Sequence, residues 1–261
     1  MSRLAACFEK GRGVARSEED ALYWYRKAAR MQEPDALNAL GVVHEAGTWA
    51  GVPQDLPKAC EYYGRAADCG QLDALTNLGY LHEKGMGVAR DALRAAELYT
   101  RAAERGYAKA QNNLGSLYYS GVGVAQDAGR AAEWYRRAAA QGSSSALNNL
   151  AICYEDGHGV PRDLEQAARH YRESADLGNA HGQKNVAFVY MKLERWAEAA
   201  DFFRKAAEQG SADAAHNLAA LYEGGHGVAR DLAAAEAMYR RAAELGHAQS
   251  EEAALRVRAE A

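Results

Sequence analysis

The 261-residue sequence has little proline and cysteine, with four residues of each, and it has no long apolar run. No window approaches 18 uninterrupted apolar residues, so membrane insertion is not predicted. The first residues, MSRLAACFEKGRGV, lack the apolar core of a secretory signal. A cytoplasmic location is therefore expected, unless the chain is a processed or trimmed fragment.

A surplus of positive charge is also lacking. The chain has 31 Lys and Arg residues against 35 Asp and Glu residues, a formal net charge of −4, and charges of both signs are interleaved. A protein that neutralises a phosphate backbone needs a basic surplus, so no nucleic-acid partner is predicted. With 48% apolar and 25% charged residues, the composition is that of a folded soluble protein.

The cysteines are too few to predict a disulfide scaffold in a chain of this length. Cys60 and Cys69 lie nine positions apart in what is read as one helix and its end. That spacing corresponds to about 13 Å of helical rise, whereas a disulfide needs Cα atoms within about 7 Å. Cys7, Cys60, Cys69 and Cys153 are therefore predicted to be free thiols that act as small buried hydrophobes.

The sequence does contain a repeated phrase. ALTNLGYLHEKGMGV begins at residue 74, AQNNLGSLYYSGVGV at 110 and ALNNLAICYEDGHGV at 146, which gives a basic step of 36 residues. A fixed period of this length is typical of a solenoid, in which each unit buries its apolar face by stacking on its neighbours. The glycine pairs that mark the copies are Gly11/Gly13, Gly47/Gly51, Gly85/Gly87, Gly121/Gly123, Gly157/Gly159 and Gly225/Gly227. The Gly47/Gly51 pair is stretched by two extra residues.

Each copy is predicted to form two helices. In the copy from residue 110, apolar residues at three-to-four spacing indicate a first helix that ends at Gly121, a glycine suited to a left-handed C-cap. Asp127 is then the expected N-cap of the second helix, because a short carboxylate accepts hydrogen bonds from the free N–H groups. The same place is held by Asp55, Asp91, Asp163 and Asp231.

The combined phrase A-x-x-N-L-G-x-x-Y-x-x-G-x-G-V-x-x-D, followed by K/R-A-x-x-W/Y-Y-x-x-A-A, resembles the Sel-one-like repeat family, relatives of the tetratricopeptide repeats. The resemblance covers nearly the whole chain in seven copies. It implies an all-α fold, a right-handed α-solenoid of about seven helix-turn-helix hairpins with a C-terminal capping helix. It also implies use as a protein-binding scaffold.

The expected organisation is a single repeat domain over residues 1–261, with a capping helix at 250–261. The sixth copy lacks both loop glycines and runs 32 residues, so the groove is expected to bend or narrow near Met191 to Trp196. The first helix has no polar cap before it, which suggests truncation or contact with a partner. The approximate repeats are 1–35, 36–73, 74–109, 110–145, 146–181, 182–213 and 214–249.

Asparagine recurs on the first helix of the copies. In the related tetratricopeptide architecture the matching residue faces the concave groove, where its amide can donate to and accept from a peptide backbone. A peptide-reading role is one interpretation, and hydrogen bonding to the neighbouring hairpin is the other; the two are compatible. Asn77, Asn113, Asn149, Asn185 and Asn217 share one repeat position, and Asn38, Asn112 and Asn148 hold the position before it.

Two further rows follow on the same helix. The first contains Val42, Tyr80, Ser116, Ile152, Phe188 and Ala220, which either line a binding groove or pack between repeats. The second contains Glu9, Glu45, Glu83, Glu155 and Glu223, with Tyr119 and Met191 as exceptions. These carboxylates either make the groove acidic and favour a basic ligand, or form a solvated charged stripe. The predicted partner-binding set comprises the eight asparagines with Val42, Tyr80, Tyr119, Ile152, Phe188, Glu83 and Glu155.

Signals for catalysis are weak. His44 and His82 stand where other copies have Tyr and are predicted to pack, while His158 and His226 lie two repeats apart, about 20 Å, too far to share a metal ion. The glycine pairs follow helices and lack the G-K-S/T of a phosphate-binding loop, and no G-x-S-x-G elbow occurs. No catalytic residue, metal or cofactor is predicted.

The sequence thus predicts a non-enzymatic adaptor that binds a segment of another protein in its concave groove. One alternative is a structural subunit of a large assembly. Another is a β-lactamase-like hydrolase, because some cysteine-rich members of the resembled family are associated with such activity. Their paired cysteines in successive repeats are absent from this sequence.

Overall fold

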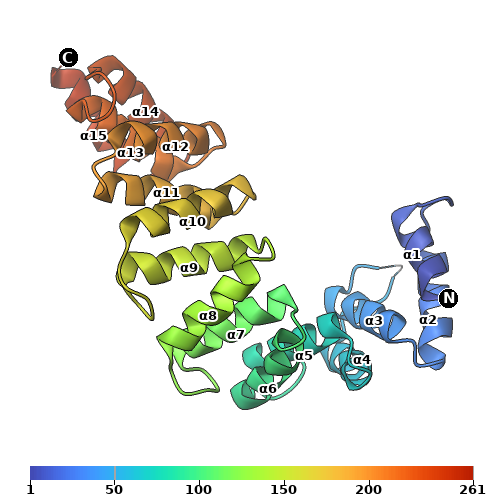
Figure 1. The fold of residues 1–261 in the computed structure, drawn as a ribbon. Coiled ribbons are helices and arrows are strands. Elements are labelled where there is room, and N and C mark those ends of the chain that lie inside the picture. The colour runs from blue at the N-terminus through green and yellow to red at the C-terminus, as the bar shows by residue number, and fades with distance from the viewer. Residues whose placement is uncertain (50, 261) are drawn as a thin grey trace. The chain divides into compact units, whose positions relative to one another are not determined.

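The computed structural model describes residues 1–49 and 51–260, and within them it contains fifteen α-helices and no strand (Figure 1). The helices follow one another as seven pairs and one further helix, which confirms an all-helical repeat fold. Their bounds are α1 Ser2–Lys10, α2 Glu18–Arg30, α3 Pro34–Ala46, α4 Leu56–Asp68, α5 Leu72–Lys84, α6 Ala92–Ala103, α7 Ala108–Ser120, α8 Ala128–Ala139, α9 Ser144–Asp156, α10 Leu164–Asp176, α11 Ala180–Lys192, α12 Trp196–Glu208, α13 Ala212–Gly224, α14 Leu232–Glu244 and α15 Ser250–Glu260.

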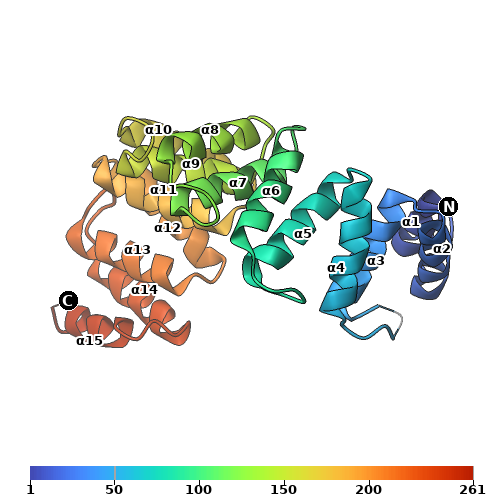
Figure 2. The ribbon, with the colours of Figure 1, turned by 90° about the horizontal axis from the view of Figure 1, so that it is seen from below.

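The chain divides into two compact units, and the boundary lies inside α8. The first unit, Met1–Trp134, contains α1 to α7, and the second, Tyr135–Ala261, contains α9 to α15. In the first unit the hairpins α1–α2, α3–α4 and α5–α6 stand next to one another in chain order (Figure 2). A single repeat domain over the whole chain stays a prediction.

Glycine ends the first helix of six hairpins, as predicted. At the end of α7, Gly121 has a φ of 71° and its N–H donates to the Leu117 carbonyl at 2.8 Å. Only glycine adopts this left-handed conformation without a steric cost, so the residue type follows from the backbone. The same left-handed cap is formed by Gly11, Gly47, Gly85, Gly157 and Gly225.

At several of the second glycines, a side chain would collide with a neighbouring hairpin, which the sequence alone does not reveal. Gly123 has a φ of 71°, and a Cβ placed on it would lie 2.1 Å from the Ala92 carbonyl oxygen at the start of α6. A Cβ placed on Gly87 would lie 2.5 Å from the carbonyl carbon of Leu56. A Cβ placed on Gly227 would lie 2.2 Å from the carbonyl carbon of Trp196. At Gly87, Gly123 and Gly227, the absence of a side chain therefore lets the loop lie against the backbone of the preceding hairpin.

The predicted aspartate N-caps are confirmed. Asp91 Oδ1 accepts from the Arg94 N–H at 2.9 Å, and the Asp91 N–H donates to the His82 carbonyl at 2.9 Å. Each aspartate thus starts the second helix and also ties the loop to the end of the first helix. The other capping aspartates are Asp55, Asp127, Asp163 and Asp231.

Tyrosine rings and small residues form the core between the helices. Tyr99 of α6 is fully buried, and a Cβ on Gly79 of α5 would lie 2.7 Å from its ring. Gly41 and Tyr63 make the same close contact in the preceding hairpin, at 2.4 Å. The glycine in the N-L-G phrase therefore makes room for an aromatic ring of the second helix.

The sixth hairpin departs from the others, as the sequence indicates. Its connection is short, because α11 ends at Lys192 and α12 begins at Trp196. Glu194 takes the left-handed position with a φ of 57°, and the Arg195 N–H donates to the Tyr190 carbonyl at 2.8 Å. Bending or narrowing of a groove near Met191 to Trp196 remains a prediction.

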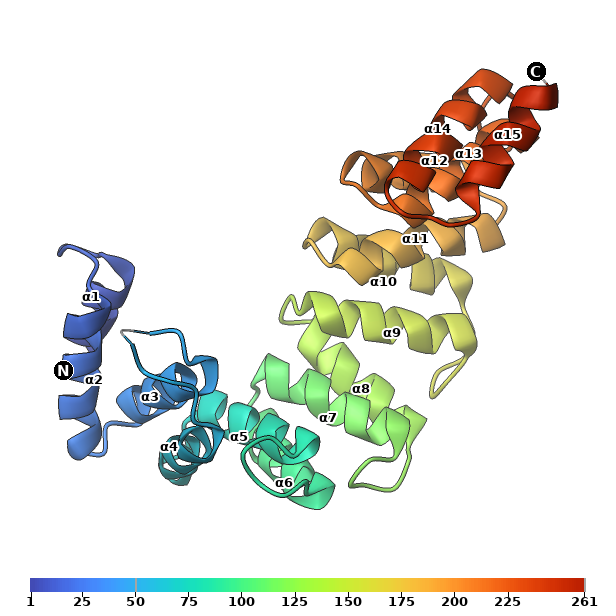
Figure 3. The same cartoon turned by 180° about the vertical axis from the view of Figure 1, so that it is seen from behind.

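Helix α15 packs on α14 and covers the end of the last hairpin (Figure 3). Ala254 and Val257 of α15 are buried together with Ala219 of α13 and Tyr239 of α14. The predicted C-terminal capping helix is confirmed over Ser250–Glu260; its last predicted residue, 261, lies outside the described residues.

All four cysteines are free thiols, as expected. Cys60 and Cys153 are buried and Cys7 is half-buried, but Cys69 is exposed at the C-cap of α4. The interpretation as a buried hydrophobe is therefore wrong for Cys69, because that residue already lies beyond the apolar stripe of its helix. None of the helices in residues 1–49 and 51–260 has the length and apolarity needed to cross a membrane.

Candidate protein-interaction surface

The repeated asparagines lie on one face of the first helices, here called the asparagine face. In the first unit this face is carried by α3, α5 and α7, and in the second by α9, α11 and α13. Most of the amides are half-buried, whereas Asn148 is buried. On the same face Val42 is 44% exposed and Tyr80 is 42% exposed, while Tyr119, Ile152 and Phe188 are half-buried.

Several asparagines hydrogen-bond to neighbouring hairpins. Asn77 Nδ2 of α5 donates to Asn38 Oδ1 of α3 at 3.4 Å, and Asn185 Nδ2 of α11 donates to Asn148 Oδ1 of α9 at 3.1 Å. Lys109 Nζ of α7 adds a bond to Asn77 Oδ1 at 3.2 Å. At these positions the asparagines therefore hydrogen-bond to the neighbouring hairpin, which was one of the two roles expected for them. Their role in peptide binding stays a prediction.

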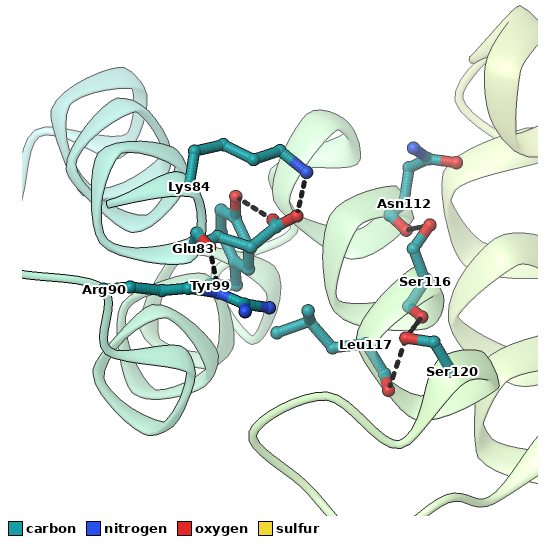
Figure 4. Close-up of polar contacts among 8 residues, drawn as sticks. All are labelled: Glu83, Lys84, Arg90, Tyr99, Asn112, Ser116, Leu117 and Ser120. Atoms are coloured by element: carbon teal, nitrogen blue, oxygen red, sulfur yellow. Dashed lines mark hydrogen bonds and ion pairs between the residues drawn. The ribbon is translucent and has the colours of Figure 1, made fainter. Parts of the chain in front are cut away.

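The glutamate row also has partners that the sequence analysis missed. The buried Tyr99 hydroxyl donates to Glu83 Oε2 at 3.0 Å (Figure 4). Burial and this carboxylate raise the pKa of Tyr99, whereas burial and the carboxylate of Glu223 raise the pKa of Tyr239 to about 12. The same kind of bond joins four further pairs, three of them sixteen positions apart and Tyr63–Glu45 eighteen positions apart, because its loop is longer: Tyr25–Glu9, Tyr63–Glu45, Tyr171–Glu155 and Tyr239–Glu223.

In the first unit the tyrosine also meets an asparagine of the next hairpin. The side-chain amide of Asn77 hydrogen-bonds the Tyr63 hydroxyl, and that of Asn113 hydrogen-bonds the Tyr99 hydroxyl. Glu83, Tyr99 and Asn113 thus form a polar chain from one hairpin to the next. We call such a set a Glu–Tyr–Asn chain.

Cations balance the glutamates unevenly. Glu83 pairs with Lys84 at 2.5 Å, Glu155 with Lys192 at 2.6 Å and Glu223 with Arg256 at 3.0 Å. Among the residues that the structure describes, no cation pairs with Glu9 or Glu45. Negative charge on this row is therefore least compensated in the first two hairpins.

A hollow of about 310 Å³ opens on this part of the asparagine face. It brings together the predicted residues Asn38 and Val42, and it adds three that the sequence analysis missed: Asp35, Trp49 and Asp73. Trp49 comes from the loop that is two residues longer than the others, and this length difference was the available signal. The hollow is completed by Glu9, Tyr25, Ala39, Val43 and Gln71.

A second hollow, of about 470 Å³, lies between α11 and α13 in the second unit. It is lined by the predicted residues Phe188 and Asn217 and by Phe203 of α12. Phe188 and Phe203 pack edge to face with ring centroids 5.4 Å apart. Lys184 and Asp213 line the same hollow and form an ion pair at 3.1 Å, so its charge is balanced.

A third hollow is lined by polar side chains that already have hydrogen-bond partners within the protein, among them Arg90, Ser116 and Ser120. The Ser116 hydroxyl donates to the Asn112 carbonyl at 3.2 Å and the Ser120 hydroxyl to the Ser116 carbonyl at 2.8 Å (Figure 4). Arg90 Nε donates to the Glu83 carbonyl at 3.1 Å. The two serines therefore bond carbonyls of their own helix, and Arg90 bonds a carbonyl at the end of α5.

The histidines act mainly in packing. His44 is buried and stacks on Tyr62 with ring centroids 5.5 Å apart, which confirms its predicted role. His226 packs on Trp196 at 5.1 Å. In the described part of the chain, no group of three or more His, Cys, Asp or Glu side chains is placed to hold a metal ion.

One histidine pair has a distinct arrangement at the C-terminal cap. The rings of His216 and His247 stack with centroids 4.2 Å apart, and Ser250 Oγ lies 2.8 Å from Nδ1 of each ring. Ser250 is fully buried, so its hydroxyl cannot reach a substrate as a nucleophile. It acts as a link that joins α13 to α15.

We expect acidic pH to loosen the contact between α15 and α13, because the folded protein disfavours protonation of His216. Burial and His247 lower the pKa of His216 in the folded protein, while Asp213 and Glu223 oppose the shift and Tyr239 contacts the ring edge. Stability from a lowered pKa is present above the unfolded value of about 6.5 and is lost as the pH falls through the folded value. A protonated His216 carries a hydrogen on Nδ1 and can only donate to Ser250 Oγ, so it no longer accepts a hydrogen bond from that hydroxyl.

The measurement is hydrogen exchange of the α15 amides between pH 7.5 and 5. His216→Asn provides the control, since asparagine stands at this repeat position in α3, α7 and α9. This variant lacks the His216 ring, so the increase in exchange of the α15 amides at acidic pH should disappear. An equal acid response in both proteins contradicts the interpretation.

Comparison with known proteins identifies the class. A sequence model of the Sel1 repeat matches residues 1–32, 34–71, 72–107, 108–143, 144–179, 197–211 and 212–247. The chain belongs to the Sel1 repeat family. The sixth match is the shortest, in agreement with the departure of that copy. Sel1 and related tetratricopeptide repeats generally mediate protein–protein interactions, and Sel1 repeat scaffolds are typically not enzymes.

Solved structures agree. The chain is similar to a Sel1 repeat protein from Oxalobacter formigenes, with 34% identity over 72% of this chain and 74% of the other and a TM-score of 0.68. It is also similar to c5321, described as a protective antigen of uropathogenic Escherichia coli strains with an SLR fold, with 30% identity, 95% and 62% coverage and a TM-score of 0.51. The C-terminal part of a TPR protein from Cytophaga hutchinsonii, at 15% identity, 97% and 98% coverage and a TM-score of 0.56, shares the fold alone. A search among curated proteins found no match.

Proposed function

We propose that this protein is an adaptor that binds a segment of another protein on its asparagine face. The proposal rests mainly on Val42 and Tyr80, which stay exposed after the hairpins have stacked. An exposed apolar row beside amides that can pair with a peptide backbone is typical of a peptide-binding surface. In this proposal, the eight asparagines, Tyr119, Ile152 and Phe188 extend the surface along the first helices, and Glu83 and Glu155 border it.

The proposal is tested with selected peptides. Twelve-residue segments that bind the full chain are selected from a displayed random library, and their affinities are measured by fluorescence anisotropy. We expect the double variant Val42→Asp/Tyr80→Asp to weaken binding at least about tenfold, since charged side chains then replace the apolar contacts. Substituting the asparagines would be less informative, because Asn77 and Asn113 also bind buried tyrosines.

The matched control is Leu93→Asp, because Leu93 is 63% exposed on α6, the second helix of its hairpin. This variant should bind the selected peptides like the parent protein. Equal affinity of the double variant and the parent, with unchanged circular dichroism, counts against the asparagine face as the binding surface. So does equal weakening by the control.

The hydrolase alternative has no comparable support. The cysteine-rich relatives that suggested it are associated with paired cysteines, whereas Cys7, Cys60, Cys69 and Cys153 are all free thiols here. The serine with histidine neighbours, Ser250, is fully buried. We therefore retain the adaptor as the proposed function.

A further inference from the structure

In the first unit, part of the asparagine face carries negative charge that no Lys or Arg side chain balances. The hollow between α1, α3 and α5 is lined by the carboxylates of Glu9, Asp35 and Asp73, and its lining contains no Lys or Arg. Val42, at its edge, is the exposed apolar side chain of α3, and Trp49 reaches it from the long loop. These residues define what we call the first hollow.

We propose that the first hollow binds a Lys or Arg side chain of the partner segment, next to an apolar residue that packs on Val42. The proposal rests on the proposed function and specifies the chemistry of the segment. The carboxylates attract the cation, and the apolar side chains cover its aliphatic stem. Trp49 offers an aromatic surface to a cation in the same hollow.

The hydrogen-bond partners of the carboxylates in the first hollow are neutral side chains. Glu9 Oε2 accepts from the Tyr25 hydroxyl at 2.5 Å. Asp73 accepts from the Tyr107 hydroxyl and, at 3.1 Å, from Gln71 Nε2. Among the described residues, no ion pair involves Asp35. A basic side chain entering the hollow therefore meets negative charge that the protein itself does not neutralise.

The second hollow differs in this respect. In the second unit Asp213 occupies the same repeat position as Asp35 and Asp73, but Lys184 pairs with it at 3.1 Å. On the glutamate row, Glu83 and Glu155 each carry a lysine partner. We therefore expect the basic residue of the partner segment to bind in the first hollow, where the carboxylates have no cationic partner. An acidic or phosphorylated residue is repelled there.

The experiment uses the same displayed library of random twelve-residue peptides and the full chain. We expect the selected peptides to be enriched in Lys or Arg directly beside an aliphatic or aromatic residue, relative to the unselected library. The double variant Asp35→Asn/Asp73→Asn should bind these peptides about tenfold more weakly, and its affinity should depend less on salt. Asparagine keeps the hydrogen-bond acceptor for Tyr107, so the fold is preserved, as circular dichroism can verify.

Asp213→Asn is the matched control, because it removes a carboxylate at the same repeat position whose charge is already paired. It should leave the affinity unchanged. The inference is overturned if selected peptides lack a basic residue, or if Asp35→Asn/Asp73→Asn binds them like Asp213→Asn. If Val42→Asp/Tyr80→Asp still abolishes binding in that case, the proposed function survives and only the basic-residue inference fails; if neither double variant matters, both fail.

Discussion

Gly123→Ala is expected to lower the free energy of unfolding by about 2–4 kcal/mol. The left-handed backbone at φ 71° costs a non-glycine residue about 1 kcal/mol or more. The new Cβ would also lie 2.1 Å from the Ala92 carbonyl oxygen, and backbone at that distance cannot yield without moving the neighbouring hairpin. Overpacking of this kind typically costs about 1–3 kcal/mol. Urea unfolding followed by circular dichroism gives the change.

Gly13→Ala is the control that separates the two contributions. Gly13 has a φ of 75°, but nothing lies within 4 Å of the position its Cβ would take. We expect this variant to lose about 1 kcal/mol, from the backbone conformation alone. Losses of equal size in the two variants would show that the contact between the loop and the preceding hairpin contributes little.

Tyr99→Phe is expected to cost about 2 kcal/mol, since a hydrogen bond to a charged group contributes about 1.5–3 kcal/mol. The substitution removes the hydroxyl that serves both Glu83 and Asn113, and it leaves the buried ring in place. The sixth hairpin shows the natural form of this change, because Phe203 stands in the tyrosine position and Met191 in the glutamate position.

The matching double variant, Glu83→Met/Tyr99→Phe, tests whether the two residues act as a pair. Once the carboxylate is gone, the loss of the hydroxyl should cost less, and the double-mutant cycle should give a coupling energy of about 1 kcal/mol or more. Urea unfolding of the parent, both single variants and the double variant supplies the four values. Strict additivity of the two single losses would contradict the pairing.

The sequence predicted those features that depend on local backbone chemistry. A glycine is needed where φ is positive, as at Gly121, and a short carboxylate is favoured at a helix start, as at Asp127. The period of the copies then gave the number of hairpins. Starts of the first helices were less well marked, because their N-cap residues vary; Glu33 and Tyr107, for example, make no side-chain cap.

The missed features depend on contacts between residues far apart in the chain. The Tyr99–Glu83 bond spans a loop, and the Gly123–Ala92 approach joins two hairpins, so no local pattern contains either. One exception to the glutamate row was a signal: the copy that has Met191 in the glutamate position also has Phe203 in the tyrosine position. The first hollow was predicted only in part: Asn38 and Val42 were predicted, but Asp35 and Asp73 stand at a position where three other copies carry Lys, Ser or His and only one carries Asp.

The Glu–Tyr–Asn chain has a consequence for how the protein opens. In the first unit it joins adjacent hairpins at Tyr63 and Tyr99, so separating two hairpins there breaks buried polar bonds as well as apolar contacts. Phe203 has no hydroxyl to offer, and Asn217 bonds the Asp213 carbonyl of its own helix at 2.7 Å. We therefore expect the last hairpin and its capping helix to separate from the sixth hairpin more readily than neighbouring hairpins of the first unit separate from one another.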